Sequence, residues 1–188
     1  LNAVAYGVPQ DRKRLFLLGA RKGAKLPLYP AQLTSRADST PELGISRGPS
    51  CKDALDDLPD ATCFQTLIAG DEVRTSAWGR PSAYARELRC LEPSAWHYGQ
   101  PRVWNPELLT SSARSAHTDI SQLRFAETAT GEIEPISRFF KLAPDGVSNT
   151  LRAGTDAARG AFTSPRPIHY KYPRCVTVRE MARLHGFP

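Results

Sequence analysis

The chain has 188 residues, 40% of them hydrophobic, with 16 Pro and 13 Gly, so we expect a folded but loop-rich protein able to bury a core. No apolar run approaches the about 18 residues of a membrane-spanning helix, and no basic-then-apolar leader suggests a signal peptide. The four cysteines form no CxxC pair, which argues against a metal site and favours reduced thiols in the cytoplasm.

The net charge of +6 is unevenly distributed along the chain. Residues 1–30 carry six Lys and Arg against one acidic residue, and residues 135–188 carry nine against three, whereas residues 31–134 carry ten against fifteen. Cations gathered on one surface neutralise a polyanion better than dispersed ones. The two basic ends therefore point to a nucleic-acid surface if they meet in the fold. A solvated charged face is the alternative.

The first informative element is the segment YGVPQDRKR near the N-terminus. Gly7 permits a positive φ and Pro9 fixes φ, which together predict a rigid turn. Gln10, Arg12 and Arg14 then alternate, and at a side-chain period of two they would project from one face of a strand. Such a face can bind phosphate oxygens or the edge of a base. An inert, solvated strand entrance is the alternative.

An apolar run follows this turn. Residues 13–20, KRLFLLGA, predict a buried strand because the run is short and lacks polar alternation. Residues 22–50 contain recurrent Pro, Gly and Ser without a period, so they predict a long irregular connection.

Three short helices are expected downstream, each from a capping residue followed by apolar positions. The first has Ser50 and Asp53 in the spacing of a capping box and ends before Pro59. The expected helices cover residues 51–58, 81–91 and 120–126, with Ser50, Ser82 and Asp119 as their caps.

The last third of the chain predicts a hairpin and one more helix. In residues 138–153, RFFKL and VSNTLRA are strand-like and APDG supplies the turn. Thr177 and Glu180 fit a capping box, and Val178 lies on the apolar side of the helix that follows. Arg179 and Arg183 are interpreted as solvated charges on this helix.

Two of these segments resemble conserved blocks of one enzyme family. YGVPQDRKR followed by LFLLGAR resembles the eighth block of DNA cytosine-5 methyltransferases, YGxPQxRxR, and PRCVTVREMARLHGFP, residues 173–188, is similar to their ninth block, PRxLTxREAARLQxFP. Between these blocks such enzymes carry a variable target-recognition domain. SNTLRAG, residues 148–154, is similar to the Thr-Leu element found late in that domain.

The resemblance implies a mixed α+β fold. An irregular target-recognition domain, residues 24–172, would be flanked by stubs of a doubly wound, Rossmann-like α/β methyltransferase domain at residues 1–23 and 173–188. Cut off from its sheet, the apolar strand would expose an unpaired edge, so self-association of the chain is also expected.

The resemblance also implies roles for individual residues. Gln10, Arg12 and Arg14 would border the pocket of a flipped cytosine, with the arginines holding the base and its flanking phosphates. The other implied residues fall into two groups: Thr150, Arg152 and Arg174 would bind DNA, and Thr177, Arg179 and Glu180 would be structural.

Other parts of the family pattern are absent from this sequence. There is no Gly-rich loop for S-adenosylmethionine, no Pro-Cys nucleophile and no Glu-Asn-Val segment. The cofactor site and the nucleophile are therefore expected outside this chain, which by itself would be inactive. The implied partners are double-stranded DNA and the remainder of a methyltransferase, in a bacterial, nucleoid-associated restriction-modification setting without a membrane. The alternatives are a recognition subunit or stand-alone nucleic-acid-binding module, and an RNA cytosine-5 methyltransferase.

Overall fold

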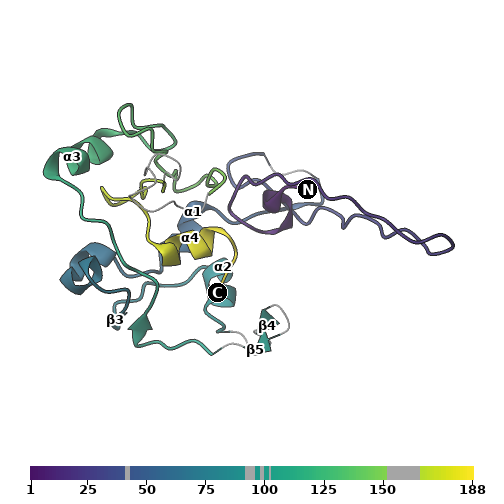
Figure 1. The fold of residues 1–188 in the computed structure, drawn as a ribbon, viewed down its shortest axis with the longest axis horizontal. Helices are drawn as coiled ribbons and strands as arrows, with labels where there is room; N and C mark the ends of the chain where they lie inside the picture. The colour runs from purple at the N-terminus through teal and green to yellow at the C-terminus, as the bar shows by residue number, and fades with distance from the viewer. Residues whose placement is uncertain (41–42, 92–95, 98–99, 102, 152–165) are drawn as a thin grey trace.

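The computed structural model describes residues 1–40, 43–91, 96–97, 100–101, 103–151 and 166–188 (Figure 1). Within these ranges the α-helices are α1 (Cys51–Leu55), α2 (Ala83–Leu88), α3 (Asp119–Glu127) and α4 (Val178–Leu184), and the 3₁₀ helices are η1 (Ala3–Tyr6), η2 (Ala61–Cys63) and η3 (Gln65–Ile68). Short helices joined by long irregular segments agree with the predicted loop-rich chain.

The strands form small pairs. They are β1 (Thr34–Ser35) parallel to β2 (Ser46–Arg47), β3 (Val73–Arg74) antiparallel to β6 (Leu108–Leu109), and β4 (Trp96–His97) antiparallel to β5 (Gln100–Pro101). No sheet within the described ranges has more than two strands. The expectation of a mixed helix-and-strand fold is confirmed.

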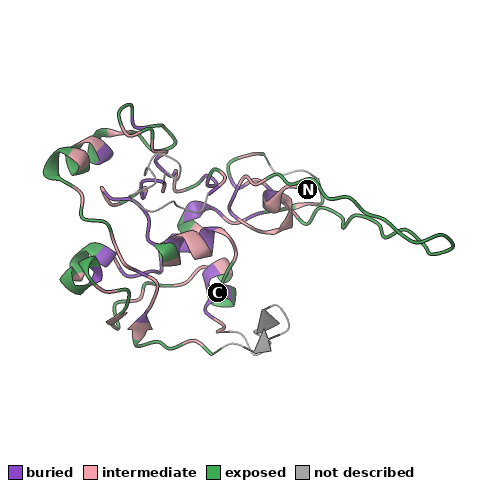
Figure 2. Cartoon of the chain, viewed as in Figure 1, coloured by how far each residue is buried: buried purple, intermediate pink, exposed green. Residues whose placement is uncertain are grey.

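The predicted buried strand at residues 13–20 is wrong in this structure. The chain from residue 15 to residue 33 instead forms a long exposed arm that doubles back at Gly23, where φ is +86° (Figures 1 and 2). Leu15 and Leu17 are 87% and 89% exposed, and in the described part of the chain residues 15–20 make no backbone hydrogen bond to another strand. An apolar run becomes a buried strand only when a neighbouring strand pairs with it.

The exposed arm leads to a prediction about association. Replacing Leu15 and Leu17 by Ser should lower self-association of the chain and change its unfolding free energy by less than about 0.5 kcal/mol, because both side chains already face solvent. Sedimentation velocity and urea unfolding measure the two quantities. Lys22→Ser, at the exposed turn of the same arm, is the control and should leave association unchanged. Equal association of the parent and the double variant would contradict this view of the arm.

The predicted helices are present, but α1 and α2 are shorter than the expected ranges 51–58 and 81–91, and one cap differs. The side chains of Ser50 and Ser82 accept hydrogen bonds from the backbone N–H groups of Asp53 and Ala85, as expected for the N-caps of α1 and α2. The cap of α3 is Thr118 rather than Asp119. Both residue types can cap a helix, so the choice depends on which of two neighbours has the extended backbone.

The predicted hairpin at residues 138–153 does not form over residues 138–151, the part of it that the structure describes. Its first arm pairs elsewhere, through bridges of Phe140 to Ile133 and of Lys141 to Ile168, and its second arm pairs through Ser148 with Gln10. The turn between the arms is present. Each arm therefore pairs with another segment of the chain instead of with the other arm. The residues of the turn between the arms do not predict these partners.

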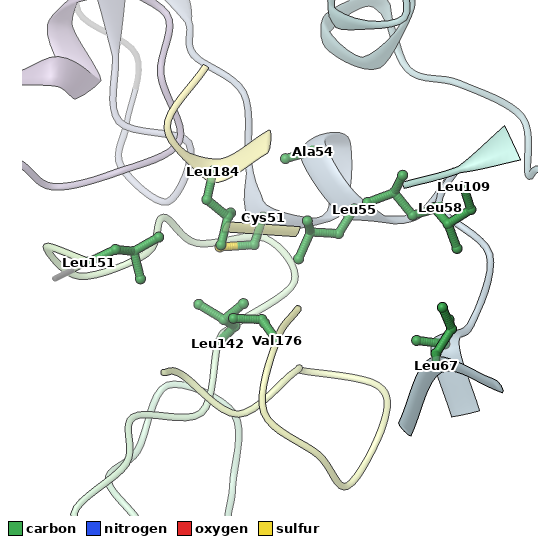
Figure 3. Close-up of a cluster of buried hydrophobic side chains, with 11 residues drawn as sticks. Cys51, Ala54, Leu55, Leu58, Leu67, Leu109, Leu142, Leu151, Val176 and Leu184 are labelled. Carbon is green, nitrogen blue, oxygen red and sulfur yellow. The ribbon is translucent and has the colours of Figure 1, made fainter. Parts of the chain in front are cut away.

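The main core brings together side chains from most of the chain (Figure 3). It consists of small and aliphatic residues from α1, η3, β6, α4 and the segments between them: Cys51, Ala54, Leu55, Leu58, Ala61, Leu67, Leu109, Leu142, Leu151, Val176 and Leu184. Two smaller clusters are Val4, Ala37 and Val147, and Phe125, Ile168 and Cys175. The central position of α1 and α4 in this core holds the candidate site in place.

Candidate nucleic-acid interface

The turn formed by YGVPQDRKR is rigid, as predicted. Gly7 follows η1 with φ at +79°, and its N–H donates to Oγ1 of Thr34 over 2.9 Å. Oδ1 of Asn2 accepts from the N–H groups of Val4 and Arg12, and its Nδ2 donates to Asp11 over 2.9 Å. These bonds cross-link the two sides of the turn, so its backbone cannot adjust freely.

This turn meets the Thr-Leu segment of the chain. The N–H of Ser148 donates to the carbonyl of Pro9 over 2.9 Å, and the N–H of Asp11 donates to the carbonyl of Ser148 over 2.8 Å. Nη1 of Arg12 donates to the carbonyl of Leu151 over 3.3 Å. The segment that carries the N-terminal basic residues therefore lies against part of the C-terminal third of the chain.

The three alternating side chains of the turn differ in accessibility. Gln10 is completely buried, Arg12 is half-buried and Arg14 is exposed, so only the two arginines can reach a ligand. The single exposed face predicted for all three is not observed, because Gln10 lies in no strand and is covered where it forms an isolated bridge with Ser148. Nη1 of Arg14 donates to the carbonyl of Lys13 over 2.7 Å, and in the described residues neither arginine is in an ion pair.

The predicted DNA-binding residues of the Thr-Leu segment are only partly seen. Oγ1 of Thr150 donates to the carbonyl of Asp11 over 2.7 Å. Because a phosphate accepts hydrogen bonds but does not donate them, this hydroxyl would have to leave Asp11 to bind one. Arg152 lies outside the described residues.

Arg174 is placed where DNA cannot reach it. The residue is 4% exposed, and its Nη1 and Nη2 donate to the two carboxylate oxygens of Glu180, each over 2.8 Å. The predicted DNA contact of Arg174 is therefore wrong for this structure. A bidentate pair with a buried carboxylate makes this arginine part of the interior.

The other residues of the C-terminal helix also make internal contacts. Thr177 caps α4, and the carboxylate of Glu180 accepts a hydrogen bond from the Thr177 N–H, which completes the predicted capping box. Arg179 donates to the carbonyl and the hydroxyl of Thr110, so it is not the solvated charge that the sequence suggested. Val178, expected on the apolar face, is 47% exposed, whereas Glu180 and Arg183 are buried.

The buried carboxylate and a neighbouring histidine have shifted pKa values. Burial alone would raise the pKa of Glu180, but the charge and hydrogen bonds of Arg174 outweigh it and lower the pKa to about 2. Burial lowers the pKa of His169 to about 4. Nδ1 of His169 accepts from the N–H of Lys171 over 3.0 Å, so the neutral ring carries its proton on Nε2.

These shifts predict a loss of stability in acid. In the unfolded chain His169 takes up a proton near pH 6.5, whereas in the folded chain it does so only near pH 4. The free energy of unfolding should therefore fall as the pH is lowered from 6.5 to 4. Protonation of Glu180 extends the fall from pH 4.5 towards 2. Urea unfolding across this range measures both steps. His169→Asn keeps an acceptor for Lys171 and should make the upper step smaller, leaving the contribution of His117, whose pKa burial also lowers; an unchanged pH profile would contradict the assignment.

A second buried charge cluster, centred on Asp57, was not predicted from the sequence. Asp57, 1% exposed, accepts from Nη1 of Arg89 and Nη1 of Arg183, each over 3.2 Å. This carboxylate joins the ends of α1 and α2 to α4, and the Tyr84 hydroxyl adds a 2.7 Å bond to the carbonyl of Arg183. The three charged residues are distant in sequence, and no local spacing relates them.

Helix α4 also contacts the basic turn. Gly186 has φ of +81°, and a Cβ at this position would lie 3.4 Å from Cγ2 of Val8. The glycine required to end the helix therefore sits directly against the turn that carries Arg12 and Arg14. In this way the segment that resembles the ninth block packs against the turn that resembles the eighth.

Two thiols can be excluded as nucleophiles. Burial raises the pKa of Cys51 and of Cys175 to about 12, so both are protonated at neutral pH, and the thiolate is the reactive form. Among the described residues no cluster of His, Cys, Asp or Glu suits a metal ion. None of the helices described is both long and apolar enough to cross a membrane.

Comparison with known proteins places these features in a family. The chain is 50% identical over its full length to the Type II methyltransferase M.XorII of Xanthomonas oryzae pv. oryzae, covering 41% of that protein. It is 26% identical to the Type II methyltransferase M.MthTI of Methanothermobacter thermautotrophicus, again over its full length and 44% of the relative. The chain thus spans less than half the length of these relatives.

A solved structure and a family model agree with these relatives. A crystal structure described as a candidate DNA modification methyltransferase encoded within a prophage (E. coli) matches the whole chain and 48% of its own, with a TM-score of 0.62 and 28% identity. The model for C-5 cytosine-specific DNA methylases matches residues 1–188. The chain therefore belongs to the C-5 cytosine-specific DNA methylase family.

Proposed function

We propose that the protein is a DNA methyltransferase that transfers a methyl group from S-adenosylmethionine to C5 of cytosine in duplex DNA, and that this chain supplies its DNA-binding and target-recognition part. The main observation in support of DNA binding is that Arg12 and Arg14 are accessible on a rigid turn that is hydrogen-bonded to Thr150. Neither arginine has an acidic partner in the described residues. The family of the chain and the names of its relatives support the reaction class.

In this proposal Arg12 and Arg14 hold the flipped cytosine and the phosphates beside it. A guanidinium offers several donors in one plane, which suits both the edge of a base and phosphate oxygens. Gln10 would support the turn from beneath, since its side chain is buried. Thr150 would fix the position of Arg12 through its bond to the adjacent Asp11 carbonyl.

We also propose the domain division. Residues 1–23 and 173–188 would belong to a doubly wound catalytic domain, and residues 24–172 would form the target-recognition domain. The exposed leucines of the arm support this division, because an apolar strand pattern without a partner fits a sheet completed by the remainder of a longer protein. The relatives, more than twice as long as the matched segment, have room for such a domain.

The described residues do not fit S-adenosylmethionine. Among the described residues α1 follows β2 through Gly48, Pro49 and Ser50, but this connection has one glycine, and no described helix follows a strand through a glycine-rich loop of the kind that seats a nucleotide-like cofactor. We therefore assign no cofactor contact and no chemical step to this chain, and the thiol that attacks cytosine is not Cys51 or Cys175.

A product analysis tests the proposed function. Full-length protein is incubated with S-adenosylmethionine and either duplex DNA or RNA, and the nucleosides are separated by mass spectrometry. We expect 5-methylcytosine in the DNA alone. Methylation of adenine or of the cytosine amino group, methylation of RNA only, or no methylation at all would each contradict the proposal.

A further inference from the structure

A cavity of about 230 Å³ lies between α2, α4 and the segment that enters β6. Its lining combines two tryptophans, Trp78 and Trp104, with Arg89 and Arg183. The exposed Val103 also lines it, so the cavity reaches the surface. This volume accommodates several water molecules or one phosphate group.

The charge around this cavity is unbalanced. Arg89 and Arg183 are 6% and 2% exposed, and among the described residues Asp57 is the one carboxylate paired with either. The cluster thus carries an excess positive charge in a region of low water content. Burying an uncompensated charge is costly, which favours an anion beside it.

Arg89 has donors left over for such an anion. Its Nη1 donates to Asp57 over 3.2 Å and to the carbonyl of Gly79 over 3.5 Å. Its Nε is buried without a hydrogen-bond partner, and no hydrogen bond of its Nη2 is formed within the described residues. A buried guanidinium with unused N–H groups at a cavity wall is incomplete without a ligand or ordered water.

The tryptophans fix the orientation of this guanidinium. Its carbon lies 4.0 Å from the ring centre of Trp104 and 5.0 Å from that of Trp78, and the two rings meet edge to face at 5.1 Å. Nε1 of Trp78 is anchored on the carbonyl of Pro106 over 2.7 Å. These ring contacts place the cation beside two aromatic surfaces, while the buried Nε still lacks a hydrogen-bond partner and can donate to a ligand.

We propose that this cavity is an oxyanion site that binds a phosphate group through the edge of Arg89, with Arg183 adding charge. Arginine forks recognise phosphate by paired, charge-assisted hydrogen bonds. The group comes either from the backbone of DNA or from a free phosphate compound; the first source rests on the proposed function, whereas phosphate binding itself does not. Through Tyr84 and Gly186 the cavity is connected to the basic turn.

Phosphate titration of the full-length protein tests this site. Inorganic phosphate is titrated against chloride at constant ionic strength, and tryptophan fluorescence is followed because Trp78 and Trp104 line the cavity. We expect a saturable change in the parent protein, and at least tenfold weaker binding in Arg89→Met. That variant keeps an aliphatic stem and leaves Asp57 and Arg183 as a balanced pair, and its circular dichroism and urea unfolding check that it folds.

Two further variants sharpen the result. Arg86→Met removes an exposed charge from the same helix, does not line the cavity and should bind phosphate like the parent. Arg89→Lys keeps the charge but not the fork, and should bind between the parent and Arg89→Met. A parent protein without a saturable response, or an Arg89→Met protein that responds like the parent, would overturn the site.

Duplex DNA then distinguishes the two sources. If DNA displaces inorganic phosphate in the parent protein, the backbone of DNA supplies the group. If both bind together, the ligand is a free phosphate compound. Failure of the cytosine product test with phosphate binding intact would overturn only the proposed function, whereas normal methylation without phosphate binding would overturn only this site.

Discussion

Asp57→Ala should lower the free energy of unfolding by about 3–5 kcal/mol, because it leaves two buried guanidiniums, those of Arg89 and Arg183, without their shared counter-charge. A domain of this size has a total stability of about 5–15 kcal/mol, so the variant should be partly unfolded at moderate temperature. The carboxylate also joins α1, α2 and α4, and its loss should loosen all three. Urea unfolding followed by circular dichroism measures the change.

An exposed ion pair provides the matched control. Glu107 pairs with Arg74 over 3.2 Å, with side chains 74% and 79% exposed, so Glu107→Ala should cost less than about 1 kcal/mol. Combining Asp57→Ala with Arg89→Met and Arg183→Met should recover much of the lost stability, since no unpaired charge then remains. If Asp57→Ala costs no more than Glu107→Ala, the buried cluster does not hold the helices together.

Arg14→Ala should reduce kcat/KM for DNA methylation by about 10- to 100-fold in the full-length protein, the effect of losing one charge-assisted hydrogen bond worth about 1.5–3 kcal/mol. The fold should be unaffected, because Arg14 is exposed and its guanidinium bonds only to the neighbouring Lys13 carbonyl among the described residues. Methyl transfer from labelled S-adenosylmethionine measures the rate, and urea unfolding checks the stability.

Arg47 is the control for this loss of activity. It too is exposed and donates to one backbone carbonyl, that of Ser39, but it lies outside the turn, so Arg47→Ala should keep the parental rate. If Arg14 holds a phosphate, its removal should also make the slope of log affinity against log salt shallower by about 0.9. A parental rate for Arg14→Ala would remove this residue from the site.

The predictions that succeeded from sequence concern interactions within a few residues. The caps of α1, α2 and α4 and the positive φ of Gly7 were predicted because a side chain and the N–H three residues later meet in any helix start, and because glycine alone adopts that backbone freely. The motif of the basic turn was recognisable for the same reason. Its residues are contiguous, and their spacing carries the chemistry.

The predictions that failed depend on partners elsewhere. Residues 15–20 have the pattern of a buried strand, yet no described strand pairs with them, and the two arms of the predicted hairpin each pair with a different distant segment. Gln10 was placed beside the arginines by periodicity but is buried by Ser148. Pattern shows what a segment can bury but not what is available to cover it.

By itself the sequence determined the family, the short helices with the caps of α1, α2 and α4, and the basic turn that carries Arg12 and Arg14. Only the tertiary structure decided which charges are inside: Arg174 and Arg183, assigned from sequence to DNA or solvent, each meet a buried carboxylate. The physical reason is that each of these buried guanidiniums is stabilised by an opposite charge that converges on it in space. Asp57 and Arg183 are far apart in the chain, and this convergence is a property of the fold alone.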